Sequence, residues 1–380
     1  MTCGRTRLSG RGPAQSGGVL GSTGTEPAAG ASAASDRRNV SDVTGVILLG
    51  ACAAWSLVTA AARGGRPEGV LLAVLAVSAG YAAGRICGAL LPVVAPGVGA
   101  LAGLGLAVAA PHTTVSSPFI SPLGHTGATA ALLVLSAGAA CCAAWAARAP
   151  GLRFGLRLLA VGVAVTAGVL GSTTGVVACT GVLLCSLAAA RMPRSPGLAG
   201  LAFVTALVTA TTWATAEKAL PSGLTDSLEG QLTPHRVLLW HDALGMARAE
   251  PLLGAGPGRF GELSPTVAQA LPSDDKPHSA PLQLAAEQGL IGVALLATVF
   301  CWVLYVLWRS PRATPVALTA GAALTALATI AMVGNALSFT TVTAGAGLLA
   351  GMATARPLTD APEDPGAPDG VSVRRPAPWA

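Results

Sequence analysis

Charged and aromatic side chains are scarce in this chain of 380 residues. Only 11% of the residues are charged and 4% are aromatic, whereas 52% are hydrophobic. A soluble domain carries about 25% charged residues, so this composition excludes an ordinary soluble protein. The repeated long apolar runs predict an integral membrane protein with several spans.

Alternation of polar and apolar residues is also missing from the apolar runs, which argues against a membrane β-barrel. Backbone polar groups in lipid must be hydrogen-bonded within the protein, so the spans are expected to be helices. We therefore predict an all-α fold, a polytopic bundle of about ten transmembrane helices with one large extracytoplasmic loop. The expected spans lie at about 44–62, 69–91, 93–110, 127–147, 155–171, 174–190, 197–216, 289–308, 315–334 and 337–354.

The predicted organisation has five parts. Residues 1–43 are rich in Gly, Ser and Ala and are expected to form a disordered cytoplasmic tail. Transmembrane helices 1–7 occupy residues 44–217, and helices 8–10 occupy residues 289–354. Between them lies the large loop, residues 218–288, and a second disordered cytoplasmic tail covers residues 355–380.

The basic residues predict the orientation. With both termini in the cytoplasm, 15 of the 23 Lys and Arg residues fall in inside segments. The loop itself contains five basic and eight acidic residues, which places it on the exterior face. Arg63 and Arg66, in the first outside turn, are the exception, so the charges do not fix the topology of the first hairpin. The net charge of +6 thus reflects topology and does not indicate nucleic-acid binding.

Metal-ligand patterns are absent from the loop sequence. None of the eight cysteines lies there, and its carboxylates are not clustered at ligand spacing. We expect no disulfide framework, no metal and no other cofactor. The loop still holds 13 of the 40 charged side chains, so it is the part of the chain where chemistry or recognition is expected.

Two helices are predicted within the loop. Residues 234–249 have Pro234 in the first turn, and Val237, Trp240, Leu244 and Ala247 share one apolar face. Such a helix is typical of one lying on the membrane surface, with Trp240 among the interfacial aromatics. 

The second predicted helix covers residues 281–288, with Ser279 or Ala280 as its cap. His278 directly precedes it, just outside the eighth span. Between the two helices, the glycine-rich stretch from Pro251 to Gly258 lacks the Lys-Ser/Thr of a phosphate-binding Walker loop and is typical of a turn.

Taken in chain order, the motifs of the loop resemble those of the O-antigen ligase and O-antigen (Wzy-type) polymerase family of membrane glycosyltransferases. That family shows an arginine, a tryptophan one turn later, a glycine-rich stretch, a histidine, and a Gln-Glu-Gly run entering a span. The matching residues here are Arg236, Trp240, Ala243, Leu244, Met246, Pro251, Leu252, Gly254, Gly256, Gly258, Phe260, His278, Gln283, Glu287, Gly289 and Gly292.

The resemblance implies transfer of a glycan from a polyprenyl (undecaprenyl) diphosphate carrier to a hydroxyl of a glycan, lipid or protein acceptor, next to membrane lipids. His278 is the candidate general base, because an imidazole with an ordinary pKa of about 6.5 accepts a proton near neutral pH. Arg236 is the candidate diphosphate clamp, because a guanidinium binds phosphate oxygens bidentately. Arg248 and Arg259 are further candidates for diphosphate binding, and the candidate loop-supporting residues are Trp240, Gly254, Gly256 and Glu287.

The chain departs from the family pattern at two places. Ser279 stands where the family usually has asparagine, and Ser172-Thr173-Thr174 stands where members commonly carry a Ser-Arg pair. Without that arginine, either Arg236, Arg248 or Arg259 binds the donor phosphate, or the chain is a non-catalytic relative that acts as a membrane scaffold. A transporter of lipid-linked glycan is a further alternative, although Arg85 is nearly the only charged residue within a span.

Overall fold

The computed structural model describes residues 26–113, 122–217, 234–269, 276–356 and 358. Every regular element in these ranges is a helix, which confirms the all-α prediction. The chain divides into two units, Met1–Thr44 and Gly45–Ala380. All contacts described below lie within the second unit.

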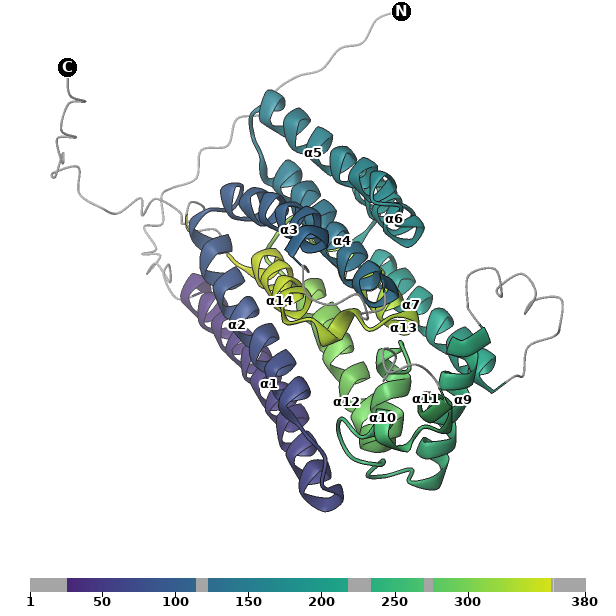
Figure 1. The fold of residues 1–380 in the computed structure, drawn as a ribbon. Helices are drawn as coiled ribbons and strands as arrows, with labels where there is room; N and C mark the ends of the chain where they lie inside the picture. Colours follow the sequence, from purple (N-terminus) through teal and green to yellow (C-terminus); the bar gives the residue numbers. More distant parts are fainter. Residues whose placement is uncertain (1–25, 114–121, 218–233, 270–275, 357, 359–380) are drawn as a thin grey trace, which may run out of the picture. The chain divides into compact units, whose positions relative to one another are not determined.

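The membrane helices follow the apolar runs of the sequence (Figure 1). Each of the ten predicted runs coincides with one helix. These helices are α1 (Glu26–Arg63), α2 (Glu68–Leu90), α3 (Val94–Thr113), α4 (Pro122–Ala146), α5 (Pro150–Val169), α6 (Thr173–Ala188), α7 (Arg194–Ala216), α12 (Ala280–Arg309), α13 (Thr314–Val333) and α14 (Thr340–Thr354). Between α7 and α12 lie α9 (Pro234–Ala249), α10 (Phe260–Leu263) and α11 (Pro265–Gln269), and the turn η1 (Ala336–Ser338) precedes α14.

Seven helices among the described residues are long and apolar enough to cross a membrane: α1 from Asp42, α2, α4 from Gly127, α5, α7, α12 and α13. Helix α6 has 16 residues and extends about 24 Å at 1.5 Å per residue. A hydrocarbon core is about 30 Å thick, so α6 is short for a span. The apolar part of α3, Val94–Ala109, and α14 are similarly short. The structure therefore contains the ten expected apolar helices, of which seven meet the requirements of a span.

Helix α1 begins earlier than the sequence analysis predicts. Its first residue is Glu26, although disorder is expected as far as residue 43. The residues from 26 to 43 include five alanines, and alanine has the strongest intrinsic helix propensity. A helix that is already formed in the first span can extend along such a sequence at low cost. The remaining tail residues, 1–25 and 359–380, lie outside the described residues.

Helices α2 and α14 pack with their backbones in contact through small residues. The glycines at this interface are Gly80, Gly84 and Gly88 on α2 and Gly347 and Gly351 on α14. A Cβ atom at Gly84 would lie 2.2 Å from the carbonyl oxygen of Leu348. Small residues allow this close approach in membranes, where association depends on packing and not on the hydrophobic effect.

Helices α4 and α13 form the centre of the bundle. In α4, 89% of the apolar segment is buried, whereas α2, α5 and α7 are mostly exposed to the surroundings. Helix α4 packs against α3, α5, α6, α13 and α14. A buried polar link holds this centre together, because the Trp145 indole and the Thr319 hydroxyl both bond to the Ser186 hydroxyl.

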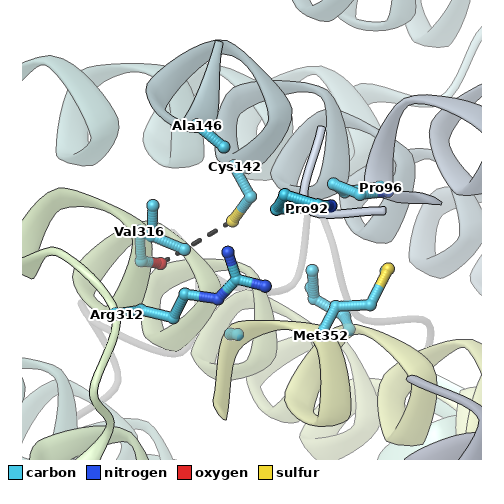
Figure 2. Close-up of a pocket in the computed structure, with 9 residues that line it drawn as sticks. Pro92, Pro96, Cys142, Ala146, Arg312, Val316 and Met352 are labelled. Atoms are coloured by element: carbon cyan, nitrogen blue, oxygen red, sulfur yellow. Dashed lines mark hydrogen bonds between the residues drawn. The ribbon is translucent and has the colours of Figure 1, made fainter. Parts of the chain in front are cut away.

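The turn between α12 and α13 is held by two arginines. Arg194 of α7 donates to the carbonyl oxygens of Ser310, at 2.6 Å, and Arg312. The buried Arg312 side chain donates in turn to the Gly88 carbonyl oxygen of α2 at 2.7 Å. Figure 2 shows this guanidinium in a small pocket beside Cys142 and Met352. These bonds satisfy backbone carbonyls where helices end, so both arginines hold helix ends together.

Candidate functional site

Helix α9 covers the predicted range, Pro234–Ala249, but its packing differs from the prediction. Trp240 is 1% exposed, which contradicts its expected position among interfacial aromatics. The reason is that α9 packs on other helices of the protein. Its apolar residues join a second core with the ends of α7, α12 and α13. The buried members of this loop core are Ala216, Leu239, Trp240, Ala243, Leu244, Phe260, Leu282 and Ala286.

One hydrogen bond joins α9 to the segment before α12. The indole Nε1 of Trp240 donates to the Pro277 carbonyl oxygen at 2.7 Å, and both residues are buried. This bond fixes the peptide immediately before His278. The sequence places Trp240 and His278 in the same motif but gives no sign of this contact.

His278 has an unusual backbone conformation. Its φ angle is 49°, and it is the only non-glycine residue with positive φ in the described part of the chain. Its side chain is buried, with 6% exposure. Positive φ in a non-glycine residue costs about 1–3 kcal/mol and persists only where the surroundings enforce it; such residues occur often at functional sites.

Helix α12 begins at Ala280, with Ser279 in the cap position and Pro281 in the first turn, as predicted. The Ser279 side chain makes no capping bond. Its hydroxyl is buried and has no hydrogen-bond partner among the described residues. Ser279 therefore places a polar group beside His278 at the positive end of a helix.

Gly289 interrupts α12, with φ 70° and ψ −169°. The interruption leaves carbonyl groups of the preceding turn without their helical partners. Other segments supply donors to these oxygens. Ala255 N bonds to Ala286 O at 2.8 Å, Gly256 N to Glu287 O at 2.9 Å, and the Trp55 indole of α1 to Gln288 O at 3.1 Å. The kink therefore joins α12 to the glycine-rich stretch and to α1.

The glycine-rich stretch surrounds a carboxylate of the protein itself. Glu287 is 4% exposed and accepts hydrogen bonds from the backbone N–H groups of Gly258 and Phe260 and from the Gln283 side chain. The prediction that this stretch is a turn, and not a Walker-type phosphate loop, fits this arrangement. Gly254, with φ 65°, lies against the backbone of Glu287, where a Cβ would be 2.5 Å from its carbonyl carbon.

The first hairpin lies against the same stretch, which the sequence analysis missed. Arg66 N donates to Pro257 O at 2.7 Å, and Arg259 Nη1 donates to Arg63 O at 2.9 Å. Arg63 also forms an ion pair with Glu250. These contacts place the turn between α1 and α2 beside the loop, which is consistent with the same side of the membrane for both. The poor fit of Arg63 and Arg66 to the positive-inside rule was the one sequence signal that could have indicated this contact.

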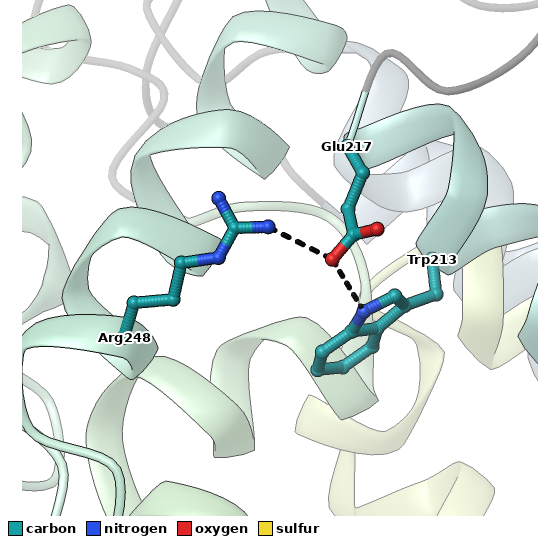
Figure 3. Close-up of polar contacts among 3 residues, drawn as sticks. All are labelled: Trp213, Glu217 and Arg248. Atoms are coloured by element: carbon teal, nitrogen blue, oxygen red, sulfur yellow. Dashed lines mark hydrogen bonds and ion pairs between the residues drawn. The ribbon is translucent and has the colours of Figure 1, made fainter.

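The three candidate diphosphate-binding arginines of the loop lie in different surroundings. Arg236 precedes Trp240 by four residues, so both lie on one side of α9, and its Nη1 donates to Val333 O at 3.3 Å. Arg259 bonds to the first hairpin and is paired with Glu262. Arg248 is exposed and bonds to Glu217 at 2.8 Å, and Figure 3 shows Trp213 bonded to the same carboxylate. Of the three, Arg236 lies one helical turn from Trp240, whose indole bonds to the residue before His278.

Asp242 organises the outer part of the loop. Its carboxylate accepts from the Ser264 hydroxyl at 2.6 Å and from Thr266 N at 3.1 Å, and so caps α11. Burial raises the pKa of Asp242, but the bonds from Ser264 and Thr266 and the nearby His241 lower it, and the net pKa is below its ordinary value. Asp242 is therefore an ionised structural group.

The fold and the site are those of a multi-pass helical membrane protein. A buried histidine lies in a folded loop between two of its spans. Residues 123–297 match the family model described as O-antigen ligase. This range runs from α4 into α12 and includes His278, so it confirms the resemblance indicated by the loop motif: the protein is O-antigen ligase-like. The match indicates a glycosyltransferase-like function in a membrane. No curated protein and no solved structure matches the chain.

Proposed function

We propose that this protein transfers a glycan from a polyprenyl-diphosphate carrier to a hydroxyl acceptor at the exterior face of the membrane. The acceptor is a second glycan, a lipid or a protein. The family match supports the reaction class. One geometric observation supports the assignment of residues: the bond from Trp240 to Pro277 joins the arginine-bearing side of α9 to the segment of His278.

His278 acts as the general base in this proposal. It accepts the proton of the acceptor hydroxyl while that oxygen attacks the anomeric carbon of the donor sugar. The bond from this carbon to the diphosphate breaks, and the diphosphate leaves with the electron pair. Because His278 is almost completely buried, bulk water is kept from competing with the acceptor.

Arg236 stabilises the leaving diphosphate. Diphosphate is already a good leaving group, so the enzyme mainly needs to balance its charge, and a guanidinium does this with two parallel hydrogen bonds. The contact with the Val333 carbonyl oxygen orients the guanidinium at the end of α13. Arg236 therefore has an anchor on the bundle and lies one helical turn from Trp240.

Other arginines compensate for the missing Ser-Arg pair. At that position Ser172 caps α6 by accepting from Gly175 N at 3.1 Å, and Thr173 follows it. Arg259, with Arg63 and Arg66 beside it, presents positive charge next to the glycine-rich stretch. We assign Arg259 and Arg248 to weaker contacts with the donor phosphates or their carrier, because both already pair with carboxylates.

His278 and Arg236, the proposed general base and diphosphate clamp, can each be tested by substitution. His278→Ala should lower transfer by about 10²–10⁴-fold, which is the usual contribution of a general base, and Arg236→Ala should also abolish most transfer. The measurement is formation of a new glycosidic bond from a lipid-diphosphate glycan by purified protein in liposomes. His241→Ala is the matched control, because His241 is an exposed histidine on α9, and it should retain transfer.

The outcomes separate the alternatives. Near-normal transfer by both His278→Ala and Arg236→Ala would remove the residue assignment. Movement of the lipid-linked glycan across the bilayer without bond formation would indicate a transporter, and neither activity in the wild type would indicate a membrane scaffold. Since the proposed mechanism uses no metal, EDTA should leave transfer unchanged.

A further inference from the structure

We propose that Trp240 is the positioning residue that holds His278 in its reactive orientation, through the bond between its indole N–H and the Pro277 carbonyl oxygen. This inference rests on the proposed function of His278. It goes further by assigning the strained conformation of the histidine to one donor on another helix.

The backbone conformation of His278 depends on its neighbours. A φ angle of 49° is disfavoured for histidine and would relax towards negative values in a free segment. Such a conformation therefore needs neighbours that fix both sides of the residue. On the C-terminal side, α12 begins within two residues, at Ala280. On the N-terminal side, the 2.7 Å bond to Pro277 O is the fixed point.

The donor of this bond, Trp240, is held rigidly by its surroundings. Trp240 is 1% exposed and packs among Leu244, Leu282 and Phe260, so the indole cannot follow the segment if it moves. A buried indole N–H without an acceptor is unfavourable, which favours keeping the Pro277 carbonyl in place. Pro277 itself contributes a fixed φ. The rotation of the peptide before His278 is thus set by α9.

Helix α9 also connects the proposed base, His278, to the proposed phosphate clamp, Arg236. Arg236 lies one turn from Trp240 on the same helix. A rigid α9 that bonds to Pro277 therefore sets the spacing between Arg236 and His278. The spacing of two groups that act on opposite sides of one bond affects catalysis strongly, and an error of about 1 Å can cost about 100-fold.

The experiment removes the indole N–H group of Trp240 by two substitutions. Trp240→Phe keeps an aromatic ring, and benzothienylalanine at position 240 keeps the full bicyclic shape with sulfur in place of the N–H. Both changes should lower the kcat of transfer about 10- to 100-fold and leave the KM for the lipid donor within about twofold. Trp145→Phe is the matched control, since Trp145 also donates from Nε1, at 3.0 Å to Ser186 Oγ, inside the bundle.

A double-mutant cycle distinguishes positioning from general support of the fold. In a His278→Ala background, Trp240→Phe should have almost no further effect, because the group that it positions is gone. The same loss of rate in both backgrounds, or a loss matched by Trp145→Phe, would overturn the proposal. Rates are compared per folded protein, measured by size-exclusion chromatography.

A second readout does not depend on transfer. His278 is 6% exposed, so it should react slowly with diethyl pyrocarbonate, and Trp240→Phe should accelerate its modification, as measured by peptide mass spectrometry. Unchanged modification would contradict the proposal even if the wild type transferred no glycan. A different result would be faster modification of His278 in Trp240→Phe while the wild type transfers no glycan. That result would support the contact between Trp240 and Pro277 but would remove the proposed function.

Discussion

Five of the seven residues with positive φ in the described part of the chain lie where the loop meets α12. His278 has positive φ, and Gly254, Gly256, Gly258 and Gly289 do as well. The four glycines adopt this conformation without a steric penalty, whereas the histidine does not. The position of the histidine is therefore stabilised by its neighbours, at a cost in stability that is typical of functional sites.

Also at the scale of single residues, Gly289 should not tolerate any side chain. A Cβ there would lie 2.4 Å from the Leu252 carbonyl oxygen, and φ is 70°. Gly289→Ala should therefore lower the free energy of unfolding by at least about 1–2 kcal/mol, the cost of a left-handed conformation alone. The measurement is thermal unfolding of the purified protein in detergent.

Gly245→Ala is the control for this prediction. Gly245 lies inside α9, and no atom is within 4 Å of its missing Cβ. Alanine is favoured over glycine in a helix by about 0.5–1 kcal/mol, so this change should leave the melting temperature unchanged or raise it. Equal melting temperatures for the two variants would show that the kink at Gly289 is not required.

At the scale of the elements, α9 supports the loop through both of its sides. Trp240 bonds to the segment before α12, and Asp242 caps α11. The same helix carries Arg236, for which we propose a role in diphosphate binding, together with Trp240 and the structural carboxylate of Asp242. Its packing on the ends of α7, α12 and α13 makes the loop a folded part of the bundle.

The cap on α11 predicts a dependence on pH. The folded state lowers the pKa of Asp242, so this residue stabilises the fold above its ordinary pKa of about 3.9, and the contribution disappears as pH falls through the folded value. Asp242→Asn should therefore destabilise the protein at pH 7, by about 1 kcal/mol for the loss of a cap, and much less near pH 3. The measurement is the difference in melting temperature between the two proteins across this pH range.

Glu262→Gln is the comparison for Asp242→Asn. Glu262 is largely exposed and pairs only with the neighbouring Arg259, and exposed pairs of this kind contribute little. Its substitution should change the melting temperature only slightly at either pH. A difference for Asp242→Asn that stays constant from pH 7 to pH 3 would show that the carboxylate does not act through its charge.

At the scale of the whole chain, segments nearly 200 residues apart form one end of the bundle. The turn between α1 and α2 contacts the glycine-rich stretch, and Trp55 reaches the kink in α12. The O-antigen ligase match covers residues 123–297 and does not include this turn. The first hairpin therefore adds contacts from outside the matched region.

A disulfide tests this arrangement. A Cβ at Gly258 would lie 3.7 Å from the Cβ of Arg66, within the range of about 3.5–4.5 Å that disulfides require. The pair Arg66→Cys and Gly258→Cys should therefore cross-link under mild oxidation, as detected by mass spectrometry of unreduced peptides. The pair Arg66→Cys and Gly245→Cys should not, and equal cross-linking of both pairs would argue against the contact.

The same cysteine at position 66 tests the proposed topology. If the hairpin and the loop face the exterior, a membrane-impermeant maleimide added to intact cells should label Arg66→Cys. Labelling only after the membrane is opened would place the loop in the cytosol and would remove the proposed function with it.

The sequence predicted the local features of the candidate site well, because these depend on neighbouring residues. The range of α9, the cap position of Ser279 and the turn from Pro251 to Gly258 all follow from residue type and spacing. The prediction was wrong for Trp240, which was expected at the membrane–water interface. An exposed face and a face buried against another part of the protein have the same apolar periodicity, so periodicity alone does not distinguish them.

The amino-acid sequence by itself determined the class of fold, since apolar runs in lipid can satisfy their backbone only as helices. It also determined which loop carries the polar residues and which family the loop resembles. Only the tertiary structure decided that Trp240 bonds to Pro277, that Glu287 occupies the N–H groups of the glycine-rich stretch, and that Arg63 and Arg66 lie beside that stretch. These contacts join residues that lie from 27 (Phe260 and Glu287) to nearly 200 positions apart. Their partners are selected by packing and by the need to satisfy buried polar groups, which no local pattern records.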